Sequence, residues 1–565
     1  MKRILTMLLI AAILCGLPGC SCSRGNTIVT VHHTELSFDE LKASGTDAKL
    51  EIARAKELLF RIERGELSGT HAQDALDART EAYRKLQTDA SVAYVRYCLD
   101  VTNEANKQAY HTLCVDTEAL SCILIDAVLL LKDDPALKGR YDTGTVEALL
   151  RADALSDAAI LPLLEREQAL VGEYEALSER LRIAYKGKEW TGDEILSDPT
   201  LSAEDFNRLY ESYLDLFNAE AGAIYLKLIP LRNEIAAALG FESYAAYRYA
   251  CFGRTYTPED AKRLSERVQR EFVPLLSELR ADYFYAAGAL YGAAFKCEPT
   301  MDRIGAQITA ILPELSEPWE YMRLHRMYDL GTDPKRMPGS FTTYFAEYGA
   351  PFLFSSWTGG FDVIPTIVHE FGHFAAYYLN GNALSRGNVL DLAEIDSQGL
   401  ELLTVLRYDT LYGAYAEAAE TAELFYALYA LIEGCVEDAF QQFAHAQQEP
   451  TPEMLNAEYG RLCTEYGLDT LGAEGRSWTQ IPHTFQSPFY YISYTTSMSA
   501  SLQLYLIGKK DPYAAADAYR SILMRKGNTE FSEALTRAGL SDPFASGTIE
   551  KLACELKKRA TALYE

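Results

Sequence analysis

Two histidines and a glutamate form the segment of this sequence whose residue types and spacing best suit catalysis. His369 and His373 lie four residues apart, with Glu370 directly after the first, in residues 364–378, which have helical periodicity. On a helix both imidazoles project from one face and can bind one zinc ion. Glu370 then lies beside the open coordination position, where its carboxylate can take a proton from a water molecule. The segment therefore predicts one catalytic Zn²⁺ ion per chain, with His369 and His373 as ligands.

A catalytic zinc site normally takes three protein ligands, so a third residue has to come from elsewhere in the chain. Downstream, residues 391–403 form another helical pattern that carries several acids. Glu394 and Glu401 are two helical turns apart and share a face, and Asp391 is one turn earlier on nearly the same stripe. The spacing by itself does not choose among these three carboxylates.

The elements that would position these residues are mostly helices. From about residue 38 to 333 apolar residues recur at helical spacing, and Ser202 and Thr257 begin segments that have the pattern of helix starts. Residues 341–345 and 352–357 are rich in aromatic and β-branched side chains and predict two short strands around a turn. The helical patterns then resume and run to the carboxyl end. We therefore expect a mainly α fold with a small β-sheet beside the zinc-binding helix.

The amino terminus has the pattern of an exported protein. Two basic residues at positions 2 and 3 precede an apolar run, residues 4–14, that is too short to span a bilayer as an anchor. The next residues, Leu17-Pro18-Gly19-Cys20, resemble the lipobox of bacterial lipoproteins, in which the cysteine is lipidated and becomes the first residue of the mature protein. An ordinary signal peptide with a nearby cysteine is the alternative. We expect residues 1–19 to be a lipoprotein signal peptide and Cys20 to be the site of lipidation.

This pattern predicts an exported lipoprotein that is anchored to the cell membrane or envelope through its N-terminal lipid. Residues 20–35 would form a tether, residues 36–200 an N-terminal helical region, and residues 201–565 the catalytic region. No later segment reaches the length of a transmembrane helix.

The composition limits the other classes of function. The 565 residues are 48% hydrophobic and 24% charged, which is typical of a globular protein. Acidic residues outnumber basic ones by 80 to 53, and the net charge of −27 has the wrong sign for a general nucleic-acid binder. We therefore expect no nucleic-acid partner, and the sequence gives no indication of an obligate protein partner.

Two of these motifs together resemble a known family. His369-Glu370-Phe371-Gly372-His373, followed by Glu394-Ile395-Asp396-Ser397-Gln398, is similar to the zinc signature of the thimet oligopeptidase and oligoendopeptidase F family of zinc metallopeptidases, which are gluzincins. In that family the first glutamate of the second helix, in an E-x-x-S/T context, is the third zinc ligand. The resemblance therefore implies that Glu394 is the ligand and that Glu401 orients a histidine.

A third segment, residues 481–494, is similar to the histidine-and-tyrosine segment of the same family. In the family these side chains face the zinc and donate hydrogen bonds to the oxyanion that forms during amide hydrolysis. The resemblance implies this role for His483, Tyr490 and Tyr494. It extends over roughly residues 200–510.

The resemblance also implies a large two-lobed helical body around a deep substrate channel. The implied activity is that of a zinc-dependent endopeptidase that hydrolyses internal bonds of short oligopeptides. Glu370 would take the proton from a zinc-activated water and return it to the leaving amine. The edge strand near residues 339–345, or its partner strand, would bind the peptide backbone by strand addition.

Two other classes of protein fit part of the pattern. One is an inactive peptide-binding lipoprotein of the same fold, but a binder has no need of Glu370. The other is a helical lipoprotein in which zinc only stabilises the fold, but structural zinc sites usually have four protein ligands and more cysteine.

Overall fold

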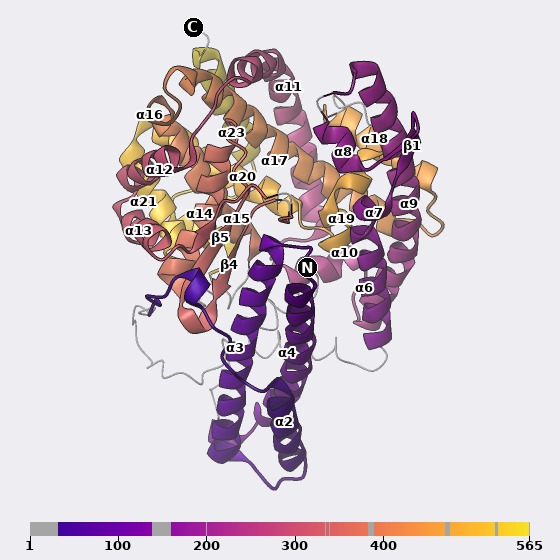
Figure 1. Ribbon diagram of the computed structural model, residues 1–565. Coiled ribbons are helices and arrows are strands. Elements are labelled where there is room, and N and C mark those ends of the chain that lie inside the picture. Colours follow the sequence, from indigo (N-terminus) through magenta and orange to yellow (C-terminus); the bar gives the residue numbers. More distant parts are fainter. Residues whose placement is uncertain are drawn as a thin grey trace.

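The computed structural model describes residues 32–137, 160–198, 200–333, 335–337, 339–381, 389–468, 475–525 and 529–563. The expected signal peptide, the lipobox with Cys20 and the first part of the tether lie outside the described residues. In the described ranges most of the chain is helical, with two small sheets (Figure 1). The mainly α fold expected from the sequence is confirmed.

The helices form three groups in space (Figure 1). The group at the bottom of the view contains α2 (Ala48–Glu63), α3 (Gly69–Leu99) and α4 (Glu104–Leu131). The group on the right contains α6 (Leu161–Glu175), α7 (Leu177–Arg180), α8 (Gly192–Ser197), α9 (Ala203–Ala238), α10 (Tyr244–Cys251), α18 (Pro452–Glu465), α19 (Pro482–Gln486) and the hairpin of β1 (Ile183–Tyr185) and β2 (Lys188–Trp190).

The third group, on the left, contains the zinc-motif helix and the second sheet. Its helices are α11 (Pro258–Leu290), α12 (Cys297–Ile311), α13 (Ser316–Leu324), α14 (Val363–Asn380), α15 (Leu390–Thr404), α16 (Tyr408–Tyr412), α17 (Ala416–Ala446), α20 (Ile492–Lys510), α21 (Pro512–Leu523), α22 (Phe531–Arg537) and α23 (Thr548–Leu563). Its strands are β3 (Tyr328–Asp329), β4 (Phe341–Phe345) and β5 (Ala350–Phe354). The two lobes expected from the resemblance correspond to the left and right groups, whereas a deep channel between them stays a prediction.

The two helix starts expected from the sequence are confirmed. Ser202 accepts a hydrogen bond from the backbone N–H of Asp205 and begins α9. Thr257 and Asp260 form a reciprocal capping box at the start of α11, with Pro258 in the first turn, where an amide proton is not needed.

The sheet beside α14 has the order β3-β5-β4, so β4 is an edge strand. β4 and β5 are antiparallel, with Thr342 opposite Leu353, and β5 is buried along its whole length. The first predicted strand is confirmed as β4. The second lies earlier than predicted, at Ala350–Phe354 instead of 352–357, because the turn between the strands is shorter than expected.

The sequence did not predict β3 or the hairpin of β1 and β2. β3 has two residues and pairs in parallel with β5, which follows it by more than 20 residues. β1 and β2 have three residues each, too few for an alternating pattern to stand out in a helical region.

Residues 32–41 are held against the turn between β4 and β5. The N–H of Thr34 donates to the carbonyl of Tyr348 over 2.8 Å, and Phe38 packs on Phe352, with ring centroids 4.4 Å apart. The last residues of the expected tether therefore contact the sheet that carries the edge strand.

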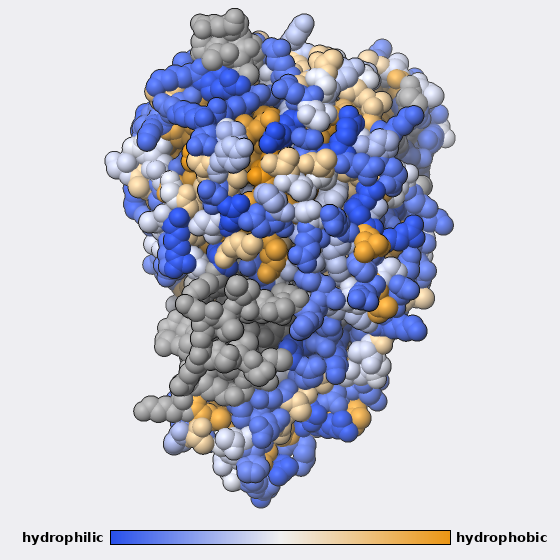
Figure 2. Space-filling model, turned by 90° about the vertical axis from the view of Figure 1, so that its left-hand side faces the viewer, coloured by the Kyte–Doolittle hydropathy of each residue, from blue (hydrophilic) through white to orange (hydrophobic). Residues whose placement is uncertain are grey.

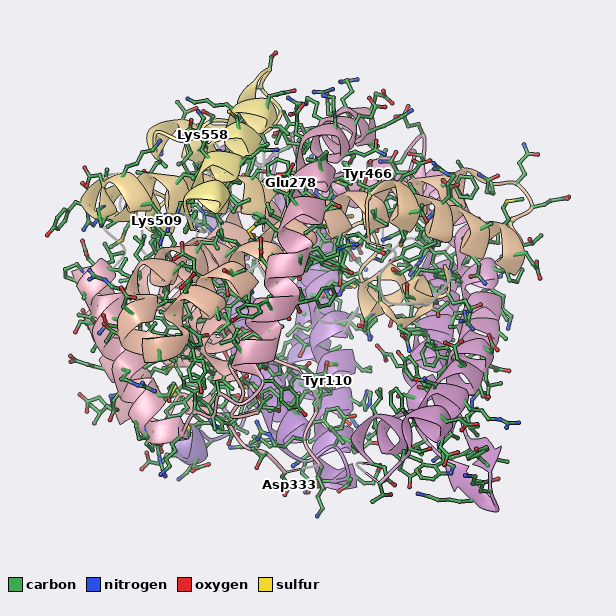
Figure 3. All side chains as sticks on the ribbon, turned by 90° about the horizontal axis from the view of Figure 1, so that it is seen from above. Tyr110, Glu278, Asp333, Tyr466, Lys509 and Lys558 are labelled. Atoms are coloured by element: carbon green, nitrogen blue, oxygen red, sulfur yellow. The ribbon has the colours of Figure 1, made fainter. Side chains whose placement is uncertain are left out.

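Most buried side chains belong to one large core, while α2, α3 and α4 also enclose a smaller core of their own. In the view from above, the layer with Tyr110 of α4 lies behind the two larger groups (Figure 3). α6 packs on α9 within the large core, so residues 161–197 share packing with the helix that follows them.

Hydrophilic residues cover most of the face shown in Figure 2, and apolar residues appear there only in small separate groups. This agrees with the excess of acidic residues in the sequence. Among the described residues, no helix has both the length and the apolar character needed to span a membrane.

Candidate metal centre and active site

α14 and α15 bring together the two histidines and one of the three candidate acids. The Oε2 atom of Glu394 lies 3.8 Å from Nε2 of His369 and 3.9 Å from Nε2 of His373. Their potential ligand atoms all lie within 4.8 Å of one another, and no other such group of three occurs in the part of the chain that the structure describes. Two imidazole nitrogens and one carboxylate oxygen match the donor set of a catalytic zinc site.

A glycine inside the histidine motif allows this approach of the two helices. A Cβ atom on Gly372 would lie 2.3 Å from the carbonyl oxygen of Asp396 and 2.6 Å from Cα of Ser397. Both neighbours are backbone atoms of α15, which cannot move aside as a flexible side chain can. Gly372 therefore lets α15 pack close enough for Glu394 to reach the histidines.

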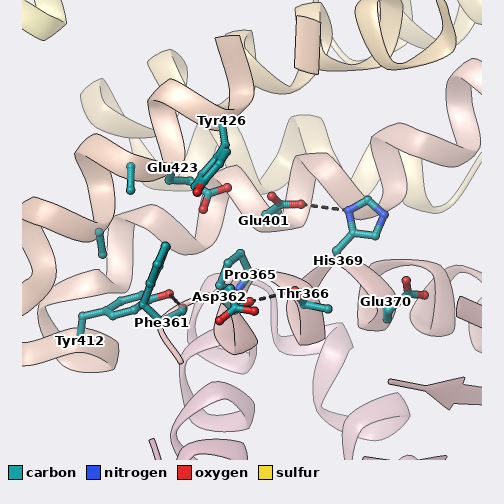
Figure 4. A pocket seen from close by; sticks show the side chains of 12 residues that line it. Phe361, Asp362, Pro365, Thr366, His369, Glu370, Glu401, Tyr412, Glu423 and Tyr426 are labelled. Atoms are coloured by element: carbon teal, nitrogen blue, oxygen red, sulfur yellow. Dashed lines mark hydrogen bonds and ion pairs between the residues drawn. The ribbon is translucent and has the colours of Figure 1, made fainter. Parts of the chain in front are cut away.

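Glu401 contacts His369 on the side of the ring that faces away from Glu394. Its Oε2 atom lies 3.0 Å from Nδ1 of His369, as the dashed line in Figure 4 shows. A proton on Nδ1 leaves Nε2 with a free lone pair for a metal ion. Burial raises the pKa of Glu401 to about 7, and burial together with the neighbouring Glu401 carboxyl raises the pKa of Glu423 well above its usual value.

The third acid has another role. Asp391 is fully buried and accepts hydrogen bonds from Thr496 at 2.6 Å and from Tyr256 at 3.1 Å. It therefore ties α15 to α20 and does not belong to the group of potential ligands.

Glu370 is buried beside this group and is held by the edge strand. The hydroxyl of Thr342 on β4 donates to the Glu370 carboxylate at 2.9 Å. Burial raises the pKa of Glu370 to about 7, although the neighbouring His369 opposes the shift. A carboxyl group with a pKa near neutrality can both accept and release a proton.

The second histidine is neutral at ordinary pH, because burial lowers the pKa of His373 to about 3. A neutral imidazole is the form that binds a metal ion. α15 is fixed nearby by the buried ion pair of Asp396 and Arg525, whose closest atoms are 2.6 Å apart.

The histidine-and-tyrosine segment lies on the same site. The Tyr490 hydroxyl donates a hydrogen bond to Oε1 of Glu394, which leaves Oε2 facing the histidines. The ring of Tyr490 lies 4.8 Å from His483 and 5.3 Å from Tyr494, measured between centroids. Burial lowers the pKa of His483 to about 4 and raises the pKa of both tyrosines well above 10, so all three are uncharged.

A cavity of about 350 Å³ opens next to His369 and Glu370 (Figure 4). Its walls combine aromatic rings with carboxylates, and Glu370 lies at one end with Tyr412 at the other. The remaining residues that line it are Phe361, Asp362, Pro365, Thr366, Glu401, Ala419, Ala422, Glu423 and Tyr426.

Comparison with known proteins shows a family similarity over the region of the metal group. Residues 322–554, which contain both helices of the metal group and the segment of His483 and Tyr490, match the model of peptidase family M3. This region of the chain is therefore similar to peptidase family M3. Oligopeptidase PepF of Bacillus subtilis (strain 168) is 27% identical over 259 residues, an alignment that covers 42% of this chain and 36% of PepF. The match therefore spans only about a third of the length of that relative.

Solved structures show that the fold similarity extends beyond the matched region. A putative oligoendopeptidase F has a TM-score of 0.78 at 22% identity, over 93% of this chain and 98% of that chain. PZ peptidase A, solved with an inhibitor, has a TM-score of 0.79 at 22% identity, over 93% and 99%. A putative oligoendopeptidase F from Bacillus anthracis has a TM-score of 0.75 at 20% identity, over 93% and 98%.

Three residues of the candidate site were not found from the sequence. Thr342 was predicted to lie on a strand, but alternation alone does not show that its hydroxyl reaches Glu370. Glu423 on α17 carries no motif, and it lines the cavity only because α17 packs beside the site. Asp396 lies in a quoted motif, but its partner Arg525 is 129 residues away.

Proposed function

We propose that this protein is a zinc-dependent endopeptidase that hydrolyses internal bonds of short oligopeptides. One observation carries the proposal: His369, His373 and Glu394 converge within 4.8 Å of one another, next to the buried carboxyl group of Glu370, in a region that matches the model of peptidase family M3. A bound zinc ion would polarise the scissile carbonyl and make a water molecule easier to deprotonate. The names of PepF and of the oligoendopeptidase F structures support a preference for oligopeptides.

Glu370 acts as the general base in this proposal. Its pKa of about 7 allows it to take the proton of the attacking water and then to deliver that proton to the leaving amine. The hydrogen bond from Thr342 orients the carboxylate during both transfers.

His483 and Tyr494 are the proposed donors to the developing oxyanion. Both are uncharged and close to Tyr490, and Nδ1 of His483 is buried with no hydrogen-bond partner among the described residues. Tyr490 is already engaged with Glu394, so its first role is to orient that ligand. A donor aimed at the oxyanion lowers the barrier of amide hydrolysis because the negative charge forms in a site shielded from water.

β4 is the proposed binding edge for the peptide backbone. It is one of the two outer strands of its sheet, and Thr342 on this strand contacts the general base. A peptide that adds as a further strand would bind through main-chain hydrogen bonds, which tolerate many sequences. The cavity of about 350 Å³ would then hold a side chain next to the scissile bond.

We also propose that the protein is an exported lipoprotein anchored to the membrane through Cys20. The support is the lipobox pattern in the sequence. Residues 32–41 bind the turn beside β4, so a lipid on Cys20 would hold this side of the molecule near the membrane. Oligopeptides at the cell envelope would be the substrates.

Hydrolysis of an internally quenched peptide of about ten residues tests the activity, with mass spectrometry to identify the cleaved bond. We expect cleavage of an internal bond, loss of activity after chelation and recovery after addition of zinc. A zinc-loaded protein that binds the peptide without cleaving it would contradict the proposal and favour a peptide-binding protein of the same fold.

A further inference from the structure

The turn that joins α19 to α20 has a strained backbone next to the metal site. Phe489 has a φ angle of 64°, in the left-handed region that residues other than glycine rarely adopt. Its side chain is fully buried, and its N–H donates to the side-chain oxygen of Gln441 over 2.8 Å. Such a conformation persists only where the surroundings hold it in place.

One buried arginine binds two successive carbonyl groups of this turn. Nη2 of Arg254 donates to the carbonyls of Phe489 and Tyr490, at 2.8 and 3.3 Å, and to the hydroxyl of Ser493 at 2.8 Å. Arg254 follows α10 and is 235 residues from Phe489 in the sequence, so this contact depends on the tertiary fold.

The surroundings of Arg254 fix its guanidinium group. The side chain is 9% exposed and lies over the rings of Tyr249 and Phe252, 4.5 and 4.9 Å from their centroids. The carboxylates of Asp391 and Asp438 supply the nearby negative charge. All three hydrogen bonds come from Nη2, and the stacking of the planar guanidinium on these rings holds that nitrogen in place.

The turn determines where the Tyr490 hydroxyl lies. Tyr490 follows Phe489 directly and donates to Oε1 of Glu394, while Oε2 of the same carboxylate faces the two histidines. A shift of the turn would move this hydroxyl and free the carboxylate to rotate. Partners that orient a metal ligand in this way contribute to metal affinity.

We propose that Arg254 is a positioning residue of the metal site. It holds the left-handed turn at Phe489, which places the Tyr490 hydroxyl on Glu394 and keeps Oε2 of Glu394 directed at the metal. The ligand set itself rests on the proposed function, whereas the contact from Arg254 to Tyr490 does not.

Zinc affinity, measured by competition with a chromogenic chelator, tests this coupling without any activity assay. The variants are Arg254→Gln, Tyr490→Phe and the double variant, and Arg280→Gln is the matched control. Like Arg254, Arg280 donates to a backbone carbonyl, in this case that of Gly467. This contact joins α11 to the residues that follow α18 and does not involve the turn at Phe489. We expect each single variant at Arg254 or Tyr490 to weaken zinc binding about tenfold. The double variant should bind zinc as Tyr490→Phe does, and the control as the wild type does.

Arg254→Lys serves as the rescue variant and as the substitute if Arg254→Gln does not fold. It keeps the charge but loses the planar group that stacks on Tyr249 and Phe252, so its affinity should lie between those of the wild type and Tyr490→Phe. Circular dichroism identifies the folded variants. A folded Arg254 variant with wild-type zinc affinity, or losses that multiply in the double variant, would overturn the proposal. If the wild type binds zinc but cleaves no peptide, the proposed function fails while this result still decides the role of Arg254.

Discussion

His369 lies between two carboxylates with different tasks. Glu394 faces its Nε2 atom on the side of the potential metal site, and Glu401 accepts from its Nδ1 atom at 3.0 Å on the other side. From the sequence spacing, either acid could have been the metal ligand. In the structure Glu394 faces Nε2 of His369 and Glu401 faces Nδ1, so the two acids have different roles. An anionic acceptor on Nδ1 makes the imidazole a stronger donor to a metal ion.

Replacement of Glu401 by Gln should therefore weaken zinc binding by about 10- to 100-fold, because a neutral amide is a weaker acceptor for the Nδ1 proton of His369 than a carboxylate. Chelator competition measures the affinity. Glu417→Gln, an exposed acid on α17, is the control and should leave the affinity unchanged. Equal affinities for Glu401→Gln and the wild type would show that Glu401 does not support the ligand.

At the scale of elements, the site depends on how closely α14 and α15 approach. The helix predicted at 364–378 is α14, and the pattern at 391–403 is α15, because a motif and an apolar periodicity coincide in both. Contacts between distant elements were not predictable. Tyr490 reaches Glu394 across 96 residues, and periodicity shows the buried face of a helix but not which element covers it. The family resemblance placed Tyr490 at the site, but its contact with Glu394 appears only in three dimensions.

Gly372→Ala should disrupt the site by forcing α14 and α15 apart. The new Cβ would meet backbone atoms at 2.3 and 2.6 Å, and overpacking of this kind costs about 1–3 kcal/mol. We expect a lower Tm and zinc binding that is at least about tenfold weaker. Gly288→Ala is the control, since a Cβ there has no neighbour within 4 Å. Unchanged zinc affinity in Gly372→Ala would contradict the role given to this close approach.

α17 carries a buried acid that makes the stability of the fold depend on pH. Glu437 accepts hydrogen bonds from Tyr459 at 2.7 Å and from Thr484 at 3.2 Å, and burial raises its pKa from the ordinary 4.5 to about 8. Below pH 4.5 the carboxyl is protonated in both folded and unfolded chains. Between pH 4.5 and 8 only the unfolded chain ionises, so the stability from Glu437 is lost as the pH rises, by an amount on the order of 5 kcal/mol.

In Glu437→Gln the side chain stays uncharged at every pH, so the variant should not show this loss of stability between pH 4.5 and 8. Calorimetry of the metal-free proteins measures the Tm of each at pH 5 and at pH 8.5. Because only the wild type loses this stability, the Tm of the variant relative to the wild type should be higher at pH 8.5 than at pH 5. The same difference at both pH values would indicate that Glu437 ionises normally in the folded protein.

At the scale of the whole molecule, the amino-terminal segment links the proposed anchor to the site. Residues 32–41 contact the turn between β4 and β5, and only residues 21–31 separate them from Cys20. Eleven extended residues span at most about 40 Å, which is close to the size of a domain. The proposed lipid would therefore restrict which face of the molecule approaches the membrane.

Cys20→Ser should abolish lipidation and release the protein from the membrane fraction, because Cys20 is the residue that the lipobox pattern designates. Incorporation of a labelled fatty acid and fractionation of cells measure both effects. Cys22→Ser, two residues further on, is the control and should remain lipidated. A labelled, membrane-bound Cys20→Ser protein would contradict the proposed anchor.

The most direct test of the central claim is the hydrolysis rate of zinc-loaded Glu370→Gln. The control is Glu317→Gln. Glu317 accepts a hydrogen bond from Tyr378, which lies near the C-terminal end of α14. The account predicts that Glu370→Gln still binds one zinc ion per chain but hydrolyses the quenched peptide about 10²- to 10⁴-fold more slowly, while the control keeps the wild-type rate. Hydrolysis at the wild-type rate by zinc-loaded Glu370→Gln would contradict the assignment of Glu370 as the general base.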